Sequence, residues 1–369
     1  MKIALIGTRG VPGNYGGFET CAEELGKRLA ERGHEIYVYN RSGYYKEKTP
    51  EYSGMKLIYI KEFRIKFIET LIHTFFSLVH CLMFHRFDIL LVFNNANSLL
   101  LAIPKLLGKK VILHVDGLEW KRGKWSRFGK KFYKCAERLS AKINIDLVAD
   151  SREIQKYYNQ MYQKETHYIA YGAPILFSRD PTVLRRYNLE PREYFLQITR
   201  FEPENNPLLT IQAFKRLNGR KKLMMVGGAK YHNAYSRQIL KESNENIIIP
   251  GFIYDKEILQ ELLCNCLGYI HGNEVGGTNP ALLEAMGAGC LVVCRDVCFN
   301  REVLGATGIY FKKDETDLYS KMAWVIEHSE KLDNKRNQAQ DRVRKIYNWD
   351  AVSVEYEQMF EKILDYQND

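Results

Sequence analysis

Short apolar runs rich in β-branched residues recur along the whole chain, and most are separated by segments long enough to form a helix. The first six runs cover residues 2–7, 35–40, 56–60, 89–94, 110–115 and 143–149. A strand in a buried parallel sheet is a continuous apolar run, because helices cover both faces of the sheet. The pattern therefore predicts a doubly wound α/β domain in the first half of the chain.

The same pattern begins again after a glycine and proline turn at residues 171–174. Six further runs cover residues 194–199, 222–227, 246–249, 267–271, 291–294 and 308–311. The chain has 369 residues, which is more than one hydrophobic core usually supports. We expect two Rossmann-like domains, 1–172 and 173–349, that face each other across a ligand-binding cleft, with a C-terminal helix at 350–369 packing back on the first.

Two glycine-rich segments follow predicted strands and open predicted helices. Gly16 and Gly17 precede the first helix, and residues 276–279 precede a helix that starts at Pro280. Glycine lets a backbone approach a ligand closely, and the unpaired N–H groups at a helix start attract phosphate. We expect both segments to bind ligand, with a plain tight turn as the alternative for the first. Glu284, one turn into the second helix, can accept hydrogen bonds from a ribose diol, or it is a solvated carboxylate.

With these motifs the sequence resembles the retaining glycosyltransferases of family 4, which have the GT-B fold, over nearly its whole length. Residues 200–205, RFEPEN, are similar to the segment that holds the donor diphosphate, with Arg200 at the arginine position and Asn205 at the lysine position. Glu284 matches the second glutamate of the family's E-x7-E motif; Gly276 occupies the first position and Glu274 lies two residues before it. The resemblance implies donor binding by Gly16, Gly17, Arg200, Asn205, Gly277, Thr278, Asn279 and Glu284.

Three segments, TRGVPGNYGGFET, HVDGLEW and GGTNPALLEAMGAG, look like those of bacterial rhamnosyltransferases that build capsular or exopolysaccharide repeat units. This resemblance implies a nucleoside-diphosphate sugar donor, which we expect to be dTDP-rhamnose, and a lipid-diphosphate-linked saccharide acceptor. A UDP- or GDP-sugar donor is one alternative. Another is a sugar-nucleotide epimerase of the same fold, which would need no acceptor.

The segment 114–120, HVDGLEW, directly follows a predicted strand, where an acceptor would enter. We expect Asp116 to orient the acceptor hydroxyl and His114 to contact the sugar, because both residue types commonly serve as proton acceptors. Glu119 and Trp120 are further acceptor-binding candidates. A purely structural role for His114 or Asp116, and packing for Trp120, are the alternatives.

Retaining transfer on one face of the sugar requires no protein nucleophile, because the leaving diphosphate takes the acceptor proton. Stabilisation of the leaving group then dominates catalysis, and we expect Arg200 and the amides of Gly16 and Gly17 to supply it. The sequence contains no Asp-x-Asp pair to hold Mg²⁺. We therefore expect neither a metal nor another cofactor.

Positive charge is concentrated in the first half of the chain. Residues 1–170 contain 28 lysines and arginines against 17 acids, whereas residues 171–369 contain 26 against 27. Residues 121–142 contain nine bases and a single acid, Glu137. This field suits an anionic surface or ligand, or else is a solvated face. A nucleic-acid-binding protein would also explain the charge, but we expect no nucleic acid because no such motif is present.

Residues 65–84 are strongly apolar, but charged and histidine side chains interrupt them at helical spacing, so they do not predict a membrane span. We expect their apolar face to cover a sheet, with docking on an anionic membrane as the alternative. The apolar run at residues 2–7 is too short to predict a secretory signal, and the eight cysteines lack zinc spacing. We expect a cytoplasmic protein at the inner face of the plasma membrane. The apolar face of the segment 65–84 consists of Ile68, Leu71, Ile72, Phe75, Val79 and Leu82.

Overall fold

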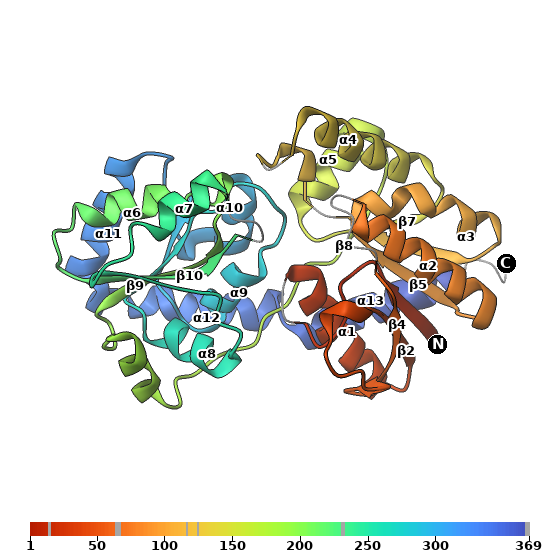
Figure 1. Cartoon of the computed structure of the whole chain (residues 1–369), viewed down its shortest axis with the longest axis horizontal. Helices are drawn as coiled ribbons and strands as arrows, with labels where there is room; N and C mark the ends of the chain where they lie inside the picture. The colour runs from red at the N-terminus through yellow and green to blue at the C-terminus, as the bar shows by residue number, and fades with distance from the viewer. Residues whose placement is uncertain (14–15, 63–67, 116, 124, 230–232, 366–369) are drawn as a thin grey trace. The chain divides into compact units, whose positions relative to one another are not determined.

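The computed structural model describes residues 1–13, 16–62, 68–115, 117–123, 125–229 and 233–365. Its contacts divide the chain into two compact units, each a β-sheet with helices packed on it (Figure 1). The first unit comprises Met1–Trp120, Trp125–Tyr171 and Trp349–Asp369, and the second comprises Lys121–Lys124 and Gly172–Asn348. The two α/β sheets predicted from the apolar runs are therefore both present.

The first unit contains an eight-stranded sheet in the order β3-β4-β2-β1-β5-β6-β7-β8. Its strands are parallel except β3, which pairs antiparallel with β4. The edge strands β3 and β8 were not predicted, because two residues are too few to show an apolar run. The strands are β1 (Lys2–Ile6), β2 (Glu35–Arg41), β3 (Glu51–Tyr52), β4 (Met55–Ile60), β5 (Ile89–Phe93), β6 (Lys110–His114), β7 (Asp146–Ala149) and β8 (His167–Tyr168).

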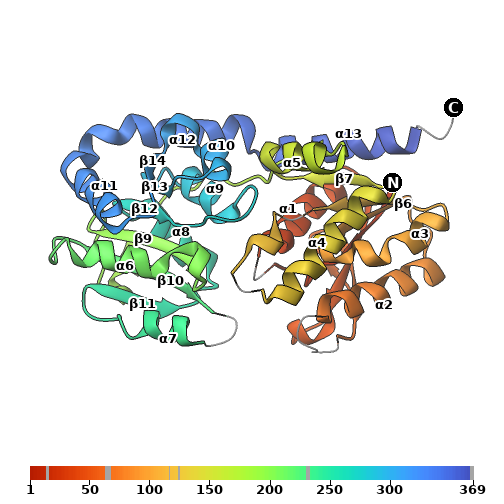
Figure 2. The same cartoon turned by 90° about the horizontal axis from the view of Figure 1, so that it is seen from above.

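Helices cover both faces of this sheet. Parallel crossovers are right-handed, so the helix that leads outward from β1 to β2 and the helix that returns from β4 to β5 lie on opposite faces. The second of these is α2, which shares its side of the first unit with α3 and α4 (Figure 2). The helices are α1 (Gly17–Glu31), α2 (Glu69–Phe84), α3 (Ala102–Leu106), α4 (Arg127–Lys142), α5 (Arg152–Tyr162) and α13 (Trp349–Asp365), with 3-10 turns η1 (Ser42–Tyr44), η2 (Asn95–Leu100) and η3 (Glu119–Lys121).

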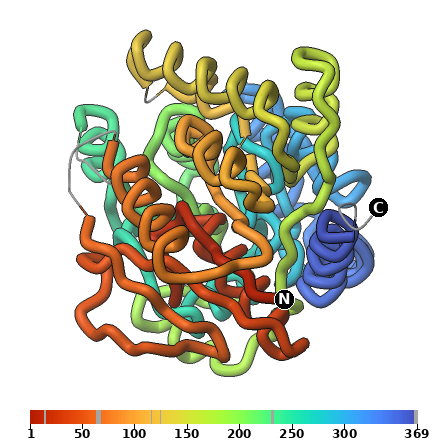
Figure 3. The backbone as a smooth tube through the Cα atoms, turned by 90° about the vertical axis from the view of Figure 1, so that its right-hand side faces the viewer, coloured from red at the N-terminus to blue at the C-terminus, as the bar shows by residue number. Residues whose placement is uncertain are grey.

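The last helix, α13, packs on α1 in the first unit, and the blue end of the tube in Figure 3 shows its course. Its inward side chains include Tyr356 and Phe360, which are fully buried. Glu357 accepts a hydrogen bond from Arg32 Nε (2.7 Å) and lies 2.7 Å from His34 Nε2. Apolar burial along one side and ion pairs at the margin therefore hold α13 to the first unit.

The second unit contains a six-stranded parallel sheet in the order β11-β10-β9-β12-β13-β14. Each strand matches one of the six apolar runs predicted after residue 174. The strands are β9 (Tyr194–Arg200), β10 (Lys222–Gly228), β11 (Ile247–Gly251), β12 (Gly268–His271), β13 (Val292–Arg295) and β14 (Ile309–Phe311). The helices are α6 (Pro207–Lys215), α7 (Ala234–Leu240), α8 (Lys256–Asn265), α9 (Pro280–Gly287), α10 (Cys298–Leu304), α11 (Glu315–His328) and α12 (Asp333–Ile346), with 3-10 turns η4 (Pro181–Tyr187), η5 (Pro203–Asn205), η6 (Gly305–Thr307) and η7 (Ser329–Leu332).

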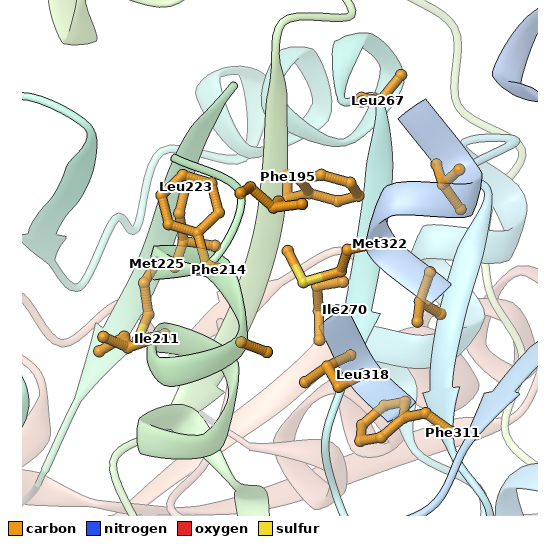
Figure 4. Close-up of a cluster of buried hydrophobic side chains, with 14 of the residues drawn as sticks. Phe195, Ile211, Phe214, Leu223, Met225, Leu267, Ile270, Phe311, Leu318 and Met322 are labelled. Atoms are coloured by element: carbon orange, nitrogen blue, oxygen red, sulfur yellow. The ribbon is translucent and has the colours of Figure 1, made fainter. Parts of the chain in front are cut away.

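The core of the second unit lies between this sheet and the helices α6 and α11 (Figure 4). Phe195 of β9 and Ile270 of β12 enter it from the sheet, and Phe214 and Met322 enter it from the helices. All four side chains are almost fully buried. This close packing fixes the strand ends from which the candidate site is built.

Helix α2 packs on β1 and β4 of the sheet, but its predicted apolar face is only partly buried: Leu71, Ile72, Val79 and Leu82 are half-buried. Phe75 is exposed, and so is Ile68 just before the helix. The fully buried side chains of α2 instead include His73, Thr74 and Ser77. His73 Nε2 lies 3.3 Å from the Asn40 carbonyl oxygen, which helps to explain how polar side chains come to face inward.

No helix among the described residues has the length and apolarity needed to cross a membrane. All eight cysteines are free thiols.

Replacing Phe360 with alanine is expected to destabilise the first unit by about 3–5 kcal/mol, because it leaves a cavity beneath α13. Urea unfolding followed by tryptophan fluorescence measures this, since Trp120, Trp125 and Trp349 all belong to the first unit. Glu361→Ala, an exposed neighbour on α13, is the control and should change the free energy of unfolding by less than about 0.5 kcal/mol. Equal effects of the two substitutions would contradict the packing of α13.

Candidate functional site

The chain of the second unit reverses its winding between β9 and β12. These strands are neighbours in the sheet, yet the chain proceeds from β9 outward to β10 and β11, and from β12 outward to β13 and β14. Ligands of open α/β sheets bind outside the carboxyl ends of the strands at such a switch point. The loops that follow β9 and β12 are therefore the candidate site of this unit, and both carry predicted site residues.

These two loops are bonded to each other. Asn206 Nδ2 donates to the Gly272 carbonyl (2.8 Å), and the Glu274 amide donates to the Glu204 carbonyl (3.0 Å). A Cβ atom at Gly272 would lie 2.3 Å from the Asn205 carbonyl oxygen, so no other residue fits there without moving that backbone. The pair of loops therefore forms one rigid edge.

Arg200 and Asn205 occupy different environments in this edge. Arg200 is the last residue of β9 and its side chain is exposed, so the guanidinium is accessible to an anionic ligand. Asn205 is buried, and its Nδ2 donates to the Arg200 carbonyl (3.0 Å). Asn205 thus holds the backbone that presents Arg200.

The predicted start of the second glycine-rich helix agrees with the structure. Asn279 is the N-cap of α9 and accepts a hydrogen bond from the Ala281 amide (3.1 Å), and Pro280 is the first helical residue. No described residue accepts a hydrogen bond from the amides of Gly276 or Gly277. Amides at the positive end of a helix can bind phosphate. Thr278 is buried in this loop, and Glu284 is half-buried one turn into α9.

Glu274 already has two cationic partners. Its Oε1 accepts from Arg295 Nε (2.9 Å) and its Oε2 from Lys313 Nζ (2.9 Å). Burial alone would raise the pKa of Glu274, but the hydrogen bonds from Lys313 and Arg295 lower it below its ordinary value. The Glu274 carboxylate is therefore bound by protein side chains. Gly276, which occupies the position of the first glutamate of the E-x7-E motif, provides no carboxylate.

Sequence reasoning missed Glu204, a buried carboxylate in the same edge. Its side chain is 7% exposed, and no described residue donates a hydrogen bond to either carboxylate oxygen. A buried carboxylate without hydrogen bonds costs stability, and such costs concentrate at functional sites. Its place within the glycosyltransferase-like segment 200–205 was visible in the sequence, but its lack of partners was not.

Buried His271 is a second polar residue that sequence reasoning missed. It ends β12, and burial lowers its pKa to about 3. No described residue is bonded to its Nε2. Its position as the last residue of a strand matches that of His114, which is the signal that could have identified it.

The first unit has a switch point between β1 and β5. Gly7, at φ +97°, packs against the end of β5 so closely that a Cβ there would lie 2.4 Å from the Phe93 carbonyl oxygen. Asn95 and Asn97 follow β5, are buried, and have side-chain oxygens that accept no hydrogen bond from the described residues. Sequence reasoning missed both asparagines, although their place after a strand was visible.

Gly16 is the N-cap residue of α1, with φ +109°, and Gly17 begins the helix. A side chain at Gly16 would lie 2.6 Å from Glu19 Oε2. Glu19 Oε1 also accepts from the Arg9 amide (2.9 Å), so this carboxylate lies at the start of α1. The helix start is open to a ligand, but a phosphate there would meet a carboxylate.

His114 ends β6 and is completely buried. Its ring stacks with Phe93 and with Tyr171, at centroid distances of 5.5 and 5.4 Å. Its Nδ1 lies 3.1 Å from the Val115 carbonyl oxygen, which can only accept, so Nδ1 carries the proton and Nε2 is an acceptor without a described partner. Burial lowers the pKa of His114 to about 4. The ring can accept a hydrogen bond from a hydroxyl group but is a weak base.

The remaining predicted residues of this segment are Asp116, Glu119 and Trp120. Asp116 lies outside the described residues. Glu119 is buried and accepts from Trp125 Nε1 (3.0 Å). Trp120 Nε1 donates to Glu137 (3.1 Å), and Lys134 Nζ lies 4.1 Å from the centre of its ring. The indole of Trp120 therefore packs against neighbouring side chains of the first unit, and part of it remains exposed.

Among the described residues, no three histidine, cysteine, aspartate or glutamate side chains gather in a way that could hold a metal ion. The positive groups that the second unit presents near its strand ends are the exposed Arg200 guanidinium and the partial positive charge at the start of α9. Such groups can bind a diphosphate and stabilise charge on a leaving group.

Residues 182–343 match the family model described as Glycosyl transferases group 1, and residues 1–174 match a Domain of unknown function (DUF1972). No curated protein matches the sequence. Sucrose-phosphate synthase from Thermosynechococcus elongatus is a similar solved structure, with 15% identity, a TM-score of 0.84, and coverage of 99% of this chain and 100% of that one.

Two further structures are similar. Anabaena HepE (Alr3699) in complex with UDP has 16% identity and a TM-score of 0.77, covering 98% of this chain and 100% of that one. WaaG, a glycosyltransferase involved in lipopolysaccharide biosynthesis, has 15% identity and a TM-score of 0.72, covering 98% and 99%. The fold is therefore GT-B, as predicted, and the family match over the second unit supports glycosyl transfer of the group 1 type.

Replacing Glu204 with glutamine is expected to raise the free energy of unfolding by about 1 kcal/mol or more, because it removes a buried carboxylate to which no described residue donates a hydrogen bond. Urea unfolding at pH 7.5 checks this. Glu190→Gln, which changes an exposed carboxylate of the same unit, is the control and should have little effect. A loss of stability in the Glu204 variant would mean that the carboxylate has a partner in the unliganded protein.

Stability is expected to fall as the pH is lowered from about 6.5 to 4, because His73, His114 and His271 have pKa values of about 4, 4 and 3 in the folded protein. The unfolded chain takes up protons on these rings below about pH 6.5 and the folded chain does not, which costs up to about 1.4 kcal/mol per pH unit for each ring. Urea unfolding across this range measures the slope.

The variant His271→Gln should reduce that slope, whereas His328→Gln, which changes a partly exposed ring on α11, should leave it unchanged. An unchanged slope for His271→Gln would contradict the neutral state of that ring.

Proposed function

We propose that this chain is a retaining glycosyltransferase that moves a sugar, L-rhamnose from dTDP-rhamnose, onto a lipid-diphosphate-linked saccharide during capsular or exopolysaccharide assembly. One observation carries the proposal: the segment that matches the group 1 family contains a switch-point site with an exposed arginine, open amides and a half-buried glutamate. Each of these groups suits one part of a nucleoside-diphosphate sugar.

Binding of the donor follows from those groups. Arg200 and the amides that open α9 bind the diphosphate. Glu284 accepts hydrogen bonds from the ribose hydroxyls. Thr278 and Asn279 fix the loop that precedes α9. Asn205 acts through the backbone of Arg200, to which it is hydrogen-bonded.

Transfer proceeds on one face of the sugar. The acceptor hydroxyl oxygen forms a bond to the anomeric carbon as the bond to the diphosphate oxygen breaks, and the acceptor proton passes to the diphosphate. Arg200 and the helix amides stabilise the departing charge, so the reaction requires no metal. His114 Nε2 accepts a hydrogen bond from a sugar hydroxyl. Asp116, Glu119 and Trp120 bind and orient the acceptor.

The acceptor carries a lipid, and the basic first half of the chain supports its placement at an anionic membrane surface. We infer that the protein works in the cytoplasm at the inner face of the plasma membrane and binds no nucleic acid.

A UDP-sugar donor is the second candidate, and one observation favours it: Anabaena HepE, which shares the fold, has been solved with UDP and with UDP-glucose. A GDP-sugar is a further alternative. A sugar-nucleotide epimerase of the same fold would consume donor without acceptor, which product analysis separates from transfer.

The donor assignment predicts that dTDP and dTDP-rhamnose raise the thermal midpoint of the protein, because a ligand that binds only the folded state stabilises it. The gain is about 2.7 kcal/mol at 100 times the dissociation constant. Differential scanning fluorimetry with dTDP, UDP and GDP, each with its sugars, measures this.

Arg200→Ala and Glu284→Gln should each abolish most of the ligand-induced shift, measured against the midpoint of the same variant without ligand. Arg185→Ala and Glu257→Gln, which change exposed side chains of the second unit, serve as controls and should keep the shift. Stabilisation by UDP ligands alone would replace the dTDP assignment, and no response to any nucleotide would overturn the proposed transferase.

A further inference from the structure

The outer side of α2 carries large apolar side chains, whereas an ordinary surface helix exposes mainly polar ones. Its buried side mixes polar residues with Leu78 and Cys81. His73, Thr74 and Ser77 are fully buried, whereas Phe75, Phe76 and the C-terminal pair Met83 and Phe84 are exposed. Met83 and Phe84 are 69% and 66% exposed. Exposing this much apolar area to water is unfavourable, so the arrangement indicates a partner that covers it.

The apolar surface continues onto the neighbouring elements. Both α2 and α3 contact η2, and all three contribute exposed side chains. Leu106, at the end of α3, is 86% exposed, and Leu107 follows it. Nine of the eighteen exposed large apolar side chains among the described residues lie between Ile68 and Leu107, so the exposure is concentrated on this one part of the first unit. We call this set the α2–α3 apolar surface: Ile68, Phe75, Phe76, Met83, Phe84, Leu99, Ile103, Leu106 and Leu107.

Basic side chains border this surface. The helix α4 also contacts η2 and lies on the same side of the unit as α2 and α3 (Figure 2). Its exposed bases are Arg127, Lys131, Lys134, Arg138 and Lys142.

The one acid on α4 does not offset these bases at the surface. Glu137 is buried and accepts hydrogen bonds from Trp120 Nε1 (3.1 Å), Tyr157 OH (2.7 Å) and Tyr162 OH (2.6 Å). Phe128, 81% exposed in the first turn of α4, adds an apolar side chain among the bases.

We propose that the α2–α3 apolar surface and the basic side of α4 together dock the first unit on an anionic lipid bilayer, with α2 lying along the membrane plane and the ends of α2 and α3 inserted. Exposed apolar side chains beside uncompensated lysine and arginine are the combination that interfacial helices use on anionic lipid. This charge pattern disfavours a second copy of the chain as the occupant, because two such surfaces would bring like charges together.

This inference rests on the proposed function for its purpose, since a lipid-linked acceptor is presented at a membrane. The docking itself requires no sugar chemistry. It can therefore be tested without donor or acceptor, and its failure is distinguishable from failure of the donor assignment.

Vesicle flotation with the full chain tests the proposal. Vesicles of phosphatidylcholine with phosphatidylglycerol are expected to carry the protein to the top of the gradient, whereas vesicles of phosphatidylcholine alone should carry much less. Binding should weaken as salt is raised, because salt screens the basic side chains. Equal binding to the two kinds of vesicle, or binding to neither, would overturn the proposal.

Variants separate the two halves of the surface. The double variant Leu106→Ser with Leu107→Ser should lower partitioning about tenfold or more, because it removes inserted apolar groups. The variant Lys131→Glu with Lys134→Glu and Arg138→Glu should lower it by a similar factor and remove the salt dependence. Met161→Ser, a 60% exposed apolar residue on α5 outside the surface, is the control and should bind as the unmodified protein does.

Two further measurements keep the result interpretable. Nucleotide-induced stabilisation should be the same in the docking variants and in the unmodified protein, which shows that the second unit is intact. Analytical sedimentation without lipid should show that the unmodified protein does not self-associate through this surface. Its oligomeric state should therefore be the same as that of the Leu106/Leu107 variant. A dimer lost in that variant would overturn the membrane proposal in favour of a second copy of this chain.

Discussion

At the switch point of the second unit, between β9 and β12, the backbone of Gly272 lies against the carbonyl of Asn205. This leaves no room for a side chain between them. Hydrogen bonds from Asn206 to Gly272 and from Glu274 to Glu204 fasten the two loops together at the same place. Arg200 and the start of α9 extend from this edge, so their positions depend on it. Gly7 beside Phe93 repeats the same close approach in the first unit. Rigid backbone contacts of this kind are what allow a site to hold charged groups ready before a ligand arrives.

The electrostatics of the two strand edges are also related. His114 and His271 are each the last residue of a strand, and burial keeps each ring neutral with an acceptor nitrogen that has no described partner. Glu204 is a buried carboxylate that accepts no hydrogen bond from the described residues, whereas Glu274 is bound by Arg295 and Lys313. Acceptor groups are thus abundant near the strand ends, and a sugar, which is rich in hydroxyl donors, is a ligand that matches them.

A different balance governs the outer surface of the first unit. Helix α2 buries three polar side chains beside Leu78 and Cys81 while it exposes two phenylalanines, which is unusual for a surface helix. Helix α4 carries its charge outward because its acid is buried among tyrosines. These two features were visible in the sequence as an apolar stretch and a basic stretch. The structure showed which side chains of each helix are exposed, and this is what identifies the two stretches as one docking surface.

The sequence by itself determined the twelve main strands, the two sheets and the glycine-rich helix starts, because these depend on apolar runs and on the local preferences of glycine, proline and asparagine. It also identified Arg200 and His114 by their places at strand ends, and Glu284 by its place one turn into the helix after the glycine-rich loop. Only the tertiary structure decided which polar groups have partners: Glu274 is engaged by residues 21 and 39 positions away, whereas neither carboxylate oxygen of Glu204 accepts a hydrogen bond from a described residue. It likewise decided that α2 leaves large apolar side chains exposed. Periodicity defines a helical face, but the choice of what that face contacts depends on residues distant in the sequence.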